Sequence, residues 1–252
     1  MTIEAAVPEQ IPQLLALWKD AFGEWDGFWE LYLNTAFSPS RCRCMVEGEQ
    51  IAASLCWFDT QCNGQKQAYI YAVVTHPAYR GRGLCRRLIE DTHQHLAALE
   101  YAAALLVPAE EGLREMYQKI GYRNCTSVSE FSCDAGTMPV TIEAISPTDY
   151  ARMRRSFLPE NSVIQEDENL SFLAQQAEFF KGADFLLAAY RDEDILHAME
   201  LLGNRQAAPG ILAALNCTRG EFRAPGEETA FAMFHPLRED AAVPAYFGFA
   251  FD

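Results

Sequence analysis

Apolar and polar positions alternate along the chain with two periods, one typical of helices and the other of strands. The first helical stripe follows the i, i+3, i+4, i+7 spacing and consists of Ile11, Leu14, Leu15 and Trp18. Four further segments follow in the order strand, helix, strand, helix, at residues 68–75, 84–99, 101–109 and 110–122. Strands that alternate with helices pair in parallel through right-handed crossovers. The pattern therefore predicts an α/β fold built on a mixed sheet.

The order of predicted elements recurs in the second half of the chain. Residues 2–18, "TIEAAVPEQIPQLLALW", and 141–157, "TIEAISPTDYARMRRSF", each predict a short strand, a proline-bearing turn and an amphipathic helix. Two apolar runs broken by a charged turn, 42–58 and 184–202, predict a β-hairpin after each of them. Two such echoes in the same order indicate a duplicated unit.

A change of composition separates the two copies. The stretch "CDAGTMP", residues 133–139, has the glycine and proline content of a linker. We therefore predict two domains, 1–135 and 136–252, of which the second is a smaller and degenerate copy of the first. That second copy is expected to end on an apolar strand, "AYFGFAFD", at residues 245–252.

One loop concentrates the chemistry of the first copy. In "HPAYRGRGLCRRL", residues 76–88, four arginines and two glycines fall within eight residues. The loop follows a predicted strand and opens a predicted helix, and the first N–H groups of a helix bind anions. Gly81 and Gly83 allow the backbone to approach a phosphate closely, and the arginines add charge-assisted hydrogen bonds. The pattern predicts a pyrophosphate or similar polyanion as ligand, although a solvated basic turn would carry the same residues.

The composition limits the classes of partner. The chain has 252 residues, of which 50% are hydrophobic, and a formal net charge of -15, so a general nucleic-acid binder is not expected. The acidic balance favours a cationic small molecule, and it is also typical of proteins that are acidic for solubility. The sequence has neither an apolar run of transmembrane length nor a basic start followed by an apolar segment. We therefore expect a cytoplasmic protein without a membrane partner.

Cysteine and histidine show no spacing that is typical of a metal site, so we expect no metal cofactor. Cys42 and Cys44 are better explained as neighbours on one face of a strand. His93 and His95 lie two residues apart on the predicted helix 84–99, so they do not share a face, and we expect both at the surface. Cys85, at a helix start among arginines, is in the setting that lowers the pKa of a thiol.

The loop and its flanks resemble the GNAT superfamily of acyl-CoA N-acyltransferases. The acyl-CoA-binding loop of that family reads R/Q-x-x-G-x-G/A, and it is matched here by "RGRGLC", residues 80–85. The strand end "VVTHP" before the loop and the Y-x-x-x-G-Y element at 117–122 also match. Cys85 departs from the pattern, which has Gly or Ala there. The resemblance covers residues 1–135 well, and the second half only as a truncated copy of the same fold.

The resemblance implies a role for each matching position. Backbone amides of the loop would bind the pyrophosphate of coenzyme A, and the strand end before it would pair with the pantetheine arm and stabilise the oxyanion. Tyr117 would protonate the departing thiolate, although a core aromatic on the predicted helix would look the same. The residues predicted to bind acetyl-CoA are Val73, Val74, Thr75, Arg80, Gly81, Arg82, Gly83, Leu84, Cys85 and Arg86.

In the family that this chain resembles, the segment after the first helix lines the site of the acceptor substrate. Here that segment is the aromatic stretch 22–37. Glu24 and Trp25 are the candidate substrate-binding residues, because a carboxylate beside an aromatic face suits an ammonium group. The alternative is a helix that packs its aromatics into the core. Relatives of the enhanced-intracellular-survival type place their terminal carboxylate in the active site, which gives Asp252 a candidate catalytic role; an ordinary edge strand is the alternative.

The resemblance implies an N-acetyltransferase that moves an acetyl group from acetyl-CoA to a primary amine of a small cationic acceptor, by direct attack in a ternary complex. Two alternatives stay open: an acyl-CoA-binding sensor without turnover, and a protein or peptide acyltransferase. Tyr117 separates the enzyme from the sensor, because only turnover needs an acid at the thioester sulfur.

Overall fold

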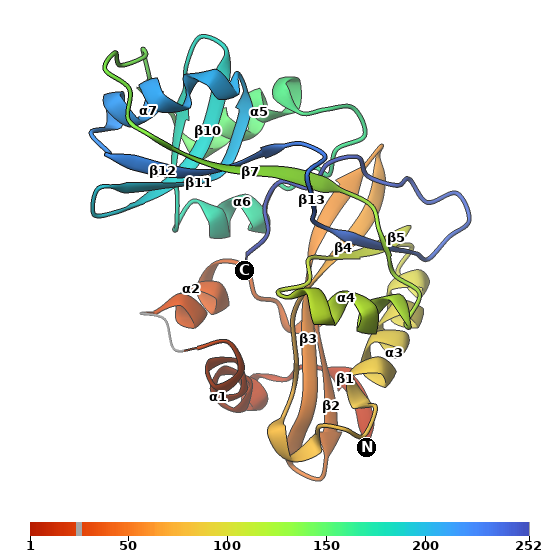
Figure 1. Cartoon of the computed structure of the whole chain (residues 1–252). Helices are drawn as coiled ribbons and strands as arrows, with labels where there is room; N and C mark the ends of the chain where they lie inside the picture. Colours follow the sequence, from red (N-terminus) through yellow and green to blue (C-terminus); the bar gives the residue numbers. More distant parts are fainter. Residues whose placement is uncertain (24–26, 252) are drawn as a thin grey trace. The chain divides into compact units, whose positions relative to one another are not determined.

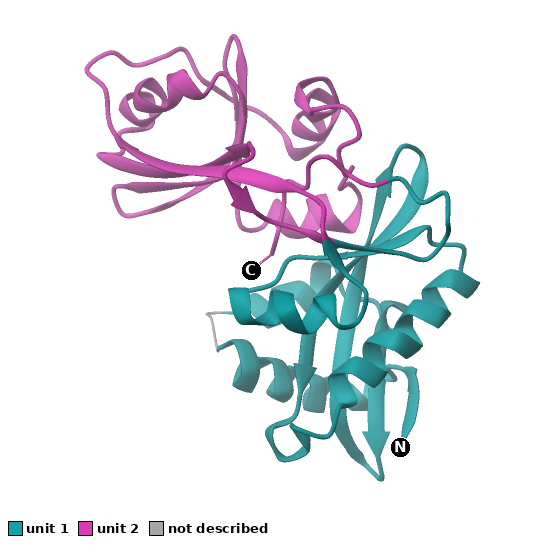
Figure 2. Ribbon diagram, turned by 45° about the vertical axis from the view of Figure 1, so that its right-hand side comes forward, with its two compact units in different colours: residues 1–123, 234–242 teal, residues 124–233, 243–252 magenta. Residues whose placement is uncertain are grey.

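The computed structural model describes residues 1–23 and 27–251, and it divides into two compact units (Figure 2). Unit 1 consists of Met1–Arg123 together with Phe234–Ala242, and unit 2 of Asn124–Met233 together with Val243–Asp252. Each is built on its own seven-stranded mixed sheet, so the predicted α/β fold is confirmed. Within the described ranges, no helix is both long and apolar enough to cross a bilayer.

The sheet of unit 1 has the strand order β1-β2-β3-β4-β5-β14-β6 (Figure 1). Its strands are β1 (Thr2–Ala5), β2 (Cys42–Glu47), β3 (Gln50–Cys62), β4 (Gln65–Thr75), β5 (Ala103–Leu106), β6 (Arg123–Asn124) and β14 (Met233–Pro236). Strands β1 to β4 pair antiparallel in sequence order, whereas β4 and β5 are parallel. As the pattern predicts, a helix makes the crossover between the two parallel strands.

Helices cover both faces of this sheet. They are η1 (Pro8–Gln10), α1 (Ile11–Phe22), α2 (Phe28–Thr35), η2 (Pro39–Arg41), η3 (Pro77–Tyr79), α3 (Leu84–Ala98) and α4 (Glu111–Gln118). Helices α1 and α2 lie on one side and α3 and α4 on the other (Figure 1). Residues 51–58 of β3 are buried at every position, which is the pattern of a strand covered on both faces. In β2, Cys42 and Cys44 are buried neighbours with sulfurs 3.9 Å apart, as expected for one strand face.

The chain returns to unit 1 after it has passed through unit 2. Strand β14 lies next to β5, and just beyond it the Leu237 N–H donates to the Ala102 carbonyl at 2.8 Å. Conversely, β7 (Ser127–Asp134) pairs with a strand of unit 2. The division therefore differs from the predicted boundary near residue 136, because strand pairing across the chain, and not chain order, decides which residues share a sheet.

The sheet of unit 2 has the strand order β13-β7-β12-β11-β10-β9-β8. Its other strands are β8 (Glu143–Ala144), β9 (Glu178–Lys181), β10 (Phe185–Asp192), β11 (Ile195–Gly203), β12 (Arg219–Pro225) and β13 (Thr229–Ala230). Strands β8 to β11 are antiparallel in sequence order, and β11 and β12 are parallel, as β1 to β5 are in unit 1. The helices are α5 (Pro147–Phe157), α6 (Glu168–Leu173), η4 (Arg205–Ala207) and α7 (Ala208–Leu215).

The repeated order of elements is present, but one of the two sequence echoes is misaligned. Helix α5 begins at Pro147, directly after the N-cap Ser146, in the place that α1 has in unit 1. The hairpin in 184–202 is β10–β11, which corresponds to β3–β4 and not to the β2–β3 hairpin in 42–58. That alignment is wrong by one strand, because apolar hairpins with charged turns resemble one another in sequence.

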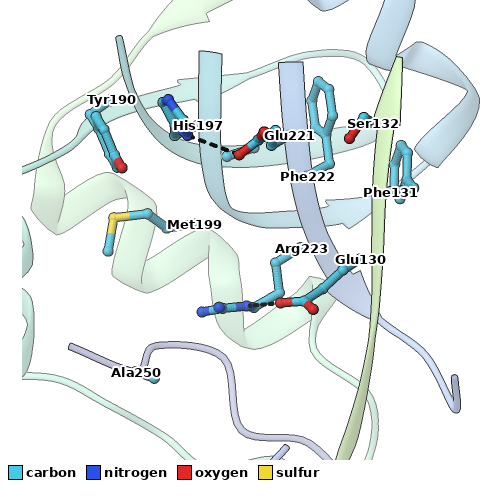
Figure 3. Close-up of a pocket in the computed structure, with 11 residues that line it drawn as sticks. Glu130, Phe131, Ser132, Tyr190, His197, Met199, Glu221, Phe222, Arg223 and Ala250 are labelled. Atoms are coloured by element: carbon cyan, nitrogen blue, oxygen red, sulfur yellow. Dashed lines mark hydrogen bonds and ion pairs between the residues drawn. The ribbon is translucent and has the colours of Figure 1, made fainter. Parts of the chain in front are cut away.

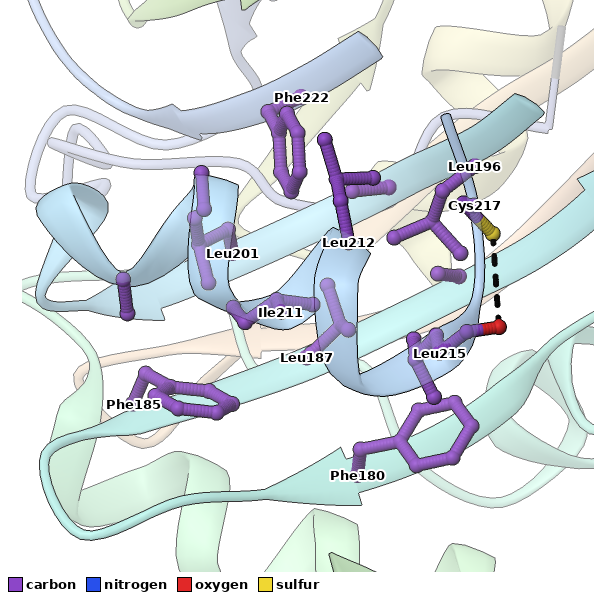
Figure 4. Packing of buried hydrophobic residues seen from close by; sticks show 14 residues of the cluster. Phe180, Phe185, Leu187, Leu196, Leu201, Ile211, Leu212, Leu215, Cys217 and Phe222 are labelled. Atoms are coloured by element: carbon purple, nitrogen blue, oxygen red, sulfur yellow. Dashed lines mark hydrogen bonds between the residues drawn. The ribbon is translucent and has the colours of Figure 1, made fainter. Parts of the chain in front are cut away.

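The core of unit 2 lies between α7 and the sheet (Figure 4). Ile211 and Leu212 of α7 are buried against the sheet, and each such side chain contributes about 1.5–3 kcal/mol to folding. The prediction of a linker at 133–139 is wrong, because the start of this segment is the end of β7 and the next residues bond to the backbone of α7. There the Gly136 N–H donates to the Pro209 carbonyl at 2.8 Å.

A buried ion pair fixes the C-terminal segment in unit 2. Arg154 of α5 makes two hydrogen bonds to Glu200 of β11, at 2.7 and 2.9 Å, and both side chains are buried. The hydroxyls of Tyr150 and Tyr246 donate to the same carboxylate at 2.6 and 3.0 Å. Gly248 lies against this group, and a Cβ there would overlap Glu200 Oε1. Only glycine therefore fits the segment at that point.

The predicted terminal strand at 245–252 is wrong, although its described part is buried. Its one ladder contact within the described chain is an isolated bridge from Tyr246 to Ser162. The Gln165 side chain instead makes two hydrogen bonds to the main chain of Phe249, at 2.7 and 3.0 Å. A side chain thus takes the place of a neighbouring strand.

Candidate functional site

Strand β4 continues beyond its partner β5 and leaves one edge open. The parallel pairing joins Gln67–Tyr69 to Ala103–Leu105 and then stops. Within the described part of the chain, the β5-facing edge of residues 72–75 therefore has no neighbouring strand. A bulge in the pairing with β3 puts Ala72 at φ 50° and bends the strand just before its end. The free N–H and C=O groups of such an edge can bind an extended ligand.

The glycine–arginine loop, residues 80–87, follows β4 and η3 and includes the first turn of α3. Its backbone is accessible. Gly81 and Gly83 have φ of 74° and 72°, in the left-handed region that favours glycine. A Cβ at either position would meet no atom within 4 Å, so the space above both glycines is open. Gly83 is the N-cap of α3 and, in the structure as described, no side chain caps the helix there. The start of α3 thus presents free donors at its positive end, as phosphate sites do.

The four arginines of the loop are exposed, and part of their charge is already paired. Arg82 lies 3.5 Å from Glu47, and Arg86 lies 2.8 Å from Glu90. Exposed pairs of this kind contribute about 0–1 kcal/mol, so a phosphate can replace the carboxylate at small cost. Arg80 donates to the Thr75 carbonyl at 3.2 Å and so ties the loop to the end of β4.

Tyr117 lies in the last turn of α4, with 6% of its surface exposed. Burial, and then the nearby Cys85 thiol, raise the pKa of Tyr117 well above its ordinary value of about 10. Burial also raises the pKa of Cys85 to about 11. The expectation of a lowered pKa at Cys85 is wrong, because the cost of burying a thiolate outweighs the helix start and the arginines. The structure thus brings Tyr117 to the first turn of α3.

A stacked pair of histidines, which the sequence reasoning missed, contacts the ring of Tyr122, and that ring in turn contacts Tyr117. His93 of α3 is 8% exposed, and its Nε2 lies 2.8 Å from the Tyr122 hydroxyl. Its ring stacks on that of His235 in β14, with centroids 4.0 Å apart. The expected surface position of His93 is therefore wrong. Its spacing from Ile89 and Leu96 is the signal that places it on the buried face of the helix.

The aromatic segment after α1 is largely core. Trp29 and Tyr32 of α2 are buried, and their ring centroids lie 5.4 and 5.7 Å from that of Trp18. The core alternative is confirmed for these residues. Glu24, Trp25 and Asp252 lie outside the described residues, so their roles stay predictions.

A pocket of about 440 Å³ lies on the sheet of unit 2 and not at the loop (Figure 3). It is lined by β7, β10, β11 and β12. Its polar side chains pair with one another: His197 Nδ1 lies 3.3 Å from Glu221, and Arg223 Nε lies 3.2 Å from Glu130 (Figure 3). The lining residues lie on strands and in the C-terminal segment and include no helix start, so the pocket lacks the uncapped N–H donors that the loop presents. The better candidate site is therefore in unit 1.

The chain is similar to known proteins both in the sequence around the loop and in the fold of nearly its whole length. A family profile described as "Acetyltransferase (GNAT) domain" matches residues 2–125. A GCN5-related N-acetyltransferase from Kribbella flavida has a TM-score of 0.72 and 17% identity, over 94% of this chain and 72% of that one. One from Anabaena variabilis has 0.74 and 16%, over 94% and 73%. Eis1 from Mycobacterium abscessus has 0.69 and 12%, over 95% and 74%. At these identities the likeness concerns the fold, and a search of curated proteins gave no significant match.

Proposed function

Because the GNAT acetyltransferase profile matches residues 2–125 of this chain, we propose that the chain is a GNAT acetyltransferase, which transfers an acetyl group from acetyl-CoA to the primary amine of a small cationic acceptor. The observation that carries this proposal is the open glycine–arginine loop at the start of α3, beside the unpaired end of β4. The amine would attack the thioester directly. The C–N bond would form first and give a tetrahedral intermediate with negative charge on the former carbonyl oxygen. The C–S bond would then break, coenzyme A would leave as the thiolate, and the attacking nitrogen would lose its extra proton to water.

The loop is the proposed site for the pyrophosphate of coenzyme A. The N–H groups from Arg82 to Arg86 would donate to its oxygens, and the open space above Gly81 and Gly83 would admit it. The exposed arginines would exchange their carboxylate partners for phosphate oxygens. Leu84 and Cys85, in the first turn of α3, would contribute through their backbone.

The open edge of β4 is the proposed site for the pantetheine arm. Val73, Val74 and Thr75 end this edge, and the arm would pair with their backbone as an added strand. One of their N–H groups, aimed at the thioester carbonyl, would stabilise the negative charge that develops on its oxygen. Removal of a donor of this kind costs about 2.7–4 kcal/mol of transition-state stabilisation in other acyl-transfer enzymes.

Tyr117 is the proposed donor to the leaving sulfur. Its raised pKa keeps the phenol protonated throughout the physiological range, so it can always donate a hydrogen bond. A cysteine-like thiol has a pKa of about 8.5, so complete proton transfer from this phenol to the thiolate is uphill. We therefore infer that Tyr117 stabilises the thiolate chiefly through a hydrogen bond.

The acceptor is proposed to be cationic because the chain carries a formal net charge of -15. An alkylammonium group has a pKa of about 10, so it must lose a proton before it attacks. Glu24 and Trp25 remain the proposed contacts of the ammonium group, and Asp252 remains a proposed catalytic carboxylate.

The test is a thiol-release assay with acetyl-CoA across polyamines, aminoglycosides, amino acids and peptides, with mass spectrometry of the products. We expect coenzyme A and an acetylated primary amine in equal amounts with cationic small molecules. Activity with peptides alone would replace the small-molecule acceptor by a peptide. Tight coenzyme A binding with no release by any amine would overturn the proposal in favour of a sensor.

A further inference from the structure

We propose that His93 and Tyr122 are positioning residues, which hold Tyr117 at a fixed place relative to the start of α3. The inference rests on the proposed role of Tyr117 at the leaving sulfur. It concerns a cluster of four rings packed together in unit 1, of which His235 is half-buried and the other three are buried. They are contributed by α3, α4 with the turn after it, and β14: His93, Tyr117, Tyr122 and His235.

Tyr122 fixes Tyr117 from one side through both main chain and ring. The Tyr122 N–H donates to the Tyr117 carbonyl at 3.1 Å, across a turn in which Gly121 takes φ 96°. The two rings meet edge to face, with centroids 5.7 Å apart. This turn also ends α4 at Gln118, so the predicted helix 110–122 is too long. Tyr122 is 3% exposed and Tyr117 is 6% exposed, so both rings are closely packed.

His93 fixes Tyr122 to the helix that begins with the loop. The His93 Nε2 and the Tyr122 hydroxyl lie 2.8 Å apart. Cys85 lies about two turns before His93 on the same helix, and its thiol is close enough to Tyr117 to raise the pKa of that phenol. Helix α3 therefore meets the tyrosine pair at two levels, through Cys85 and through His93. A hydrogen-bond donor to the sulfur must lie at a fixed distance from the site that holds the pyrophosphate. Contacts with α3, whose start is that proposed site, would keep this distance constant.

His235 backs His93 and closes the cluster. The two imidazoles are stacked almost parallel, at 13°, and a Cβ at Gly121 would come to 3.0 Å from the His235 ring. The titratable groups that face His93 are Tyr122 and His235. Burial lowers the pKa of His93 to about 3 and lowers that of His235, so both rings are neutral in the physiological range. The bond from His93 to Tyr122 is therefore insensitive to pH over that range.

The experiment compares Tyr122→Phe, His93→Phe and the double variant in the full chain with acetyl-CoA and the best amine acceptor. We expect each single variant to lower kcat about tenfold, while KM for acetyl-CoA and coenzyme A affinity by calorimetry change less than twofold. The double variant should be no slower than the slower single variant, because both remove one hydrogen bond. His93→Gln, which can still bond the hydroxyl, should recover most of the rate.

Tyr150→Phe is the matched control, since it removes a buried tyrosine hydrogen bond from unit 2. It should lower the melting temperature and leave kcat unchanged. An unchanged kcat in Tyr122→Phe, a multiplicative loss in the double variant, or no recovery by His93→Gln would overturn the positioning role. If Tyr117→Phe itself leaves kcat unchanged, the proposed role of Tyr117 fails instead, so the two failures are distinguishable.

Discussion

The two units share one order of elements but differ at the turn before the crossover helix. In unit 1 this turn is the glycine–arginine loop, whose glycines are open to solvent and whose helix start has no side-chain cap in the described structure. In unit 2 the side chain of Asn204 accepts from the Gln206 N–H at 2.9 Å and donates to Asp184 at 2.9 Å. A Cβ at Gly203 would overlap the Asp184 carbonyl. In the second turn a side chain thus satisfies the Gln206 N–H, and the space above Gly203 is filled, whereas the space above Gly81 and Gly83 is open.

A second difference lies on the strand that enters the turn. Both β4 and β11 carry a bulge, and Val74 and Glu200 are the residues that pair just beyond it. In unit 1 this position belongs to the open edge that is proposed to hold the pantetheine arm. In unit 2, Glu200 is instead bonded to Arg154 and to two tyrosines, with the C-terminal segment packed against them. The same order of elements therefore does not by itself leave a turn and a strand edge open to a ligand, and the open glycine turn and open strand end distinguish unit 1.

Removal of one tyrosine hydroxyl should change kcat strongly in unit 1 and hardly at all in unit 2. Tyr117→Phe should lower kcat about 10²–10³-fold, because the loss of one hydrogen-bond donor to a developing negative charge typically costs that much. Tyr150→Phe, at a buried tyrosine of unit 2, should leave kcat within twofold. Steady-state kinetics with acetyl-CoA measures both. Equal kcat for Tyr117→Phe and the unchanged protein would remove the catalytic distinction between the units.

The next effect is on stability and concerns unit 2 alone. Glu200→Gln should lower the free energy of unfolding by about 3–5 kcal/mol, because it leaves the buried guanidinium of Arg154 without its counter-charge. Glu178→Gln removes the partner of exposed Arg191 and should cost less than about 1 kcal/mol. Urea unfolding measures both, and coenzyme A affinity should be unchanged in each. A loss of affinity with Glu200→Gln would mean that the pair supports the loop as well.

A smaller effect depends on pH and belongs to unit 1. The pKa of His93 is lowered on folding to about 3, so the unfolded chain binds the proton more readily. The stability that this group contributes is fully present above the unfolded pKa of about 6.5 and is lost as pH falls towards 3. The expected slope for this group approaches about 1.4 kcal/mol per pH unit in that window. Urea unfolding between pH 7 and pH 5 should show a flatter dependence in His93→Phe, and an equal slope would contradict it.

The sequence predicts what is local and misses what is distant along the chain. The loop, its helix and Tyr117 lie within about forty residues, and their glycine, charge and spacing signals are read without knowledge of the rest. His235 stacks on His93 across more than 140 residues, and β14 joins a sheet whose other strands end at Asn124. Pairings of that kind leave no periodic signal. Asn204 likewise caps the second turn with a residue that has no distinguishing pattern in the sequence.

Unit 1 alone is proposed to bind coenzyme A, through the open glycine loop, and calorimetric titration of coenzyme A into the full chain tests this proposal. We predict one coenzyme A per chain, with affinity reduced at least about tenfold, or about 1.4 kcal/mol, in Gly83→Ala. Gly64→Ala, at φ 73° with an equally open Cβ, carries the same backbone strain away from the loop and should keep its affinity within twofold. Two molecules bound per chain, or equal losses in the two variants, would contradict the claim.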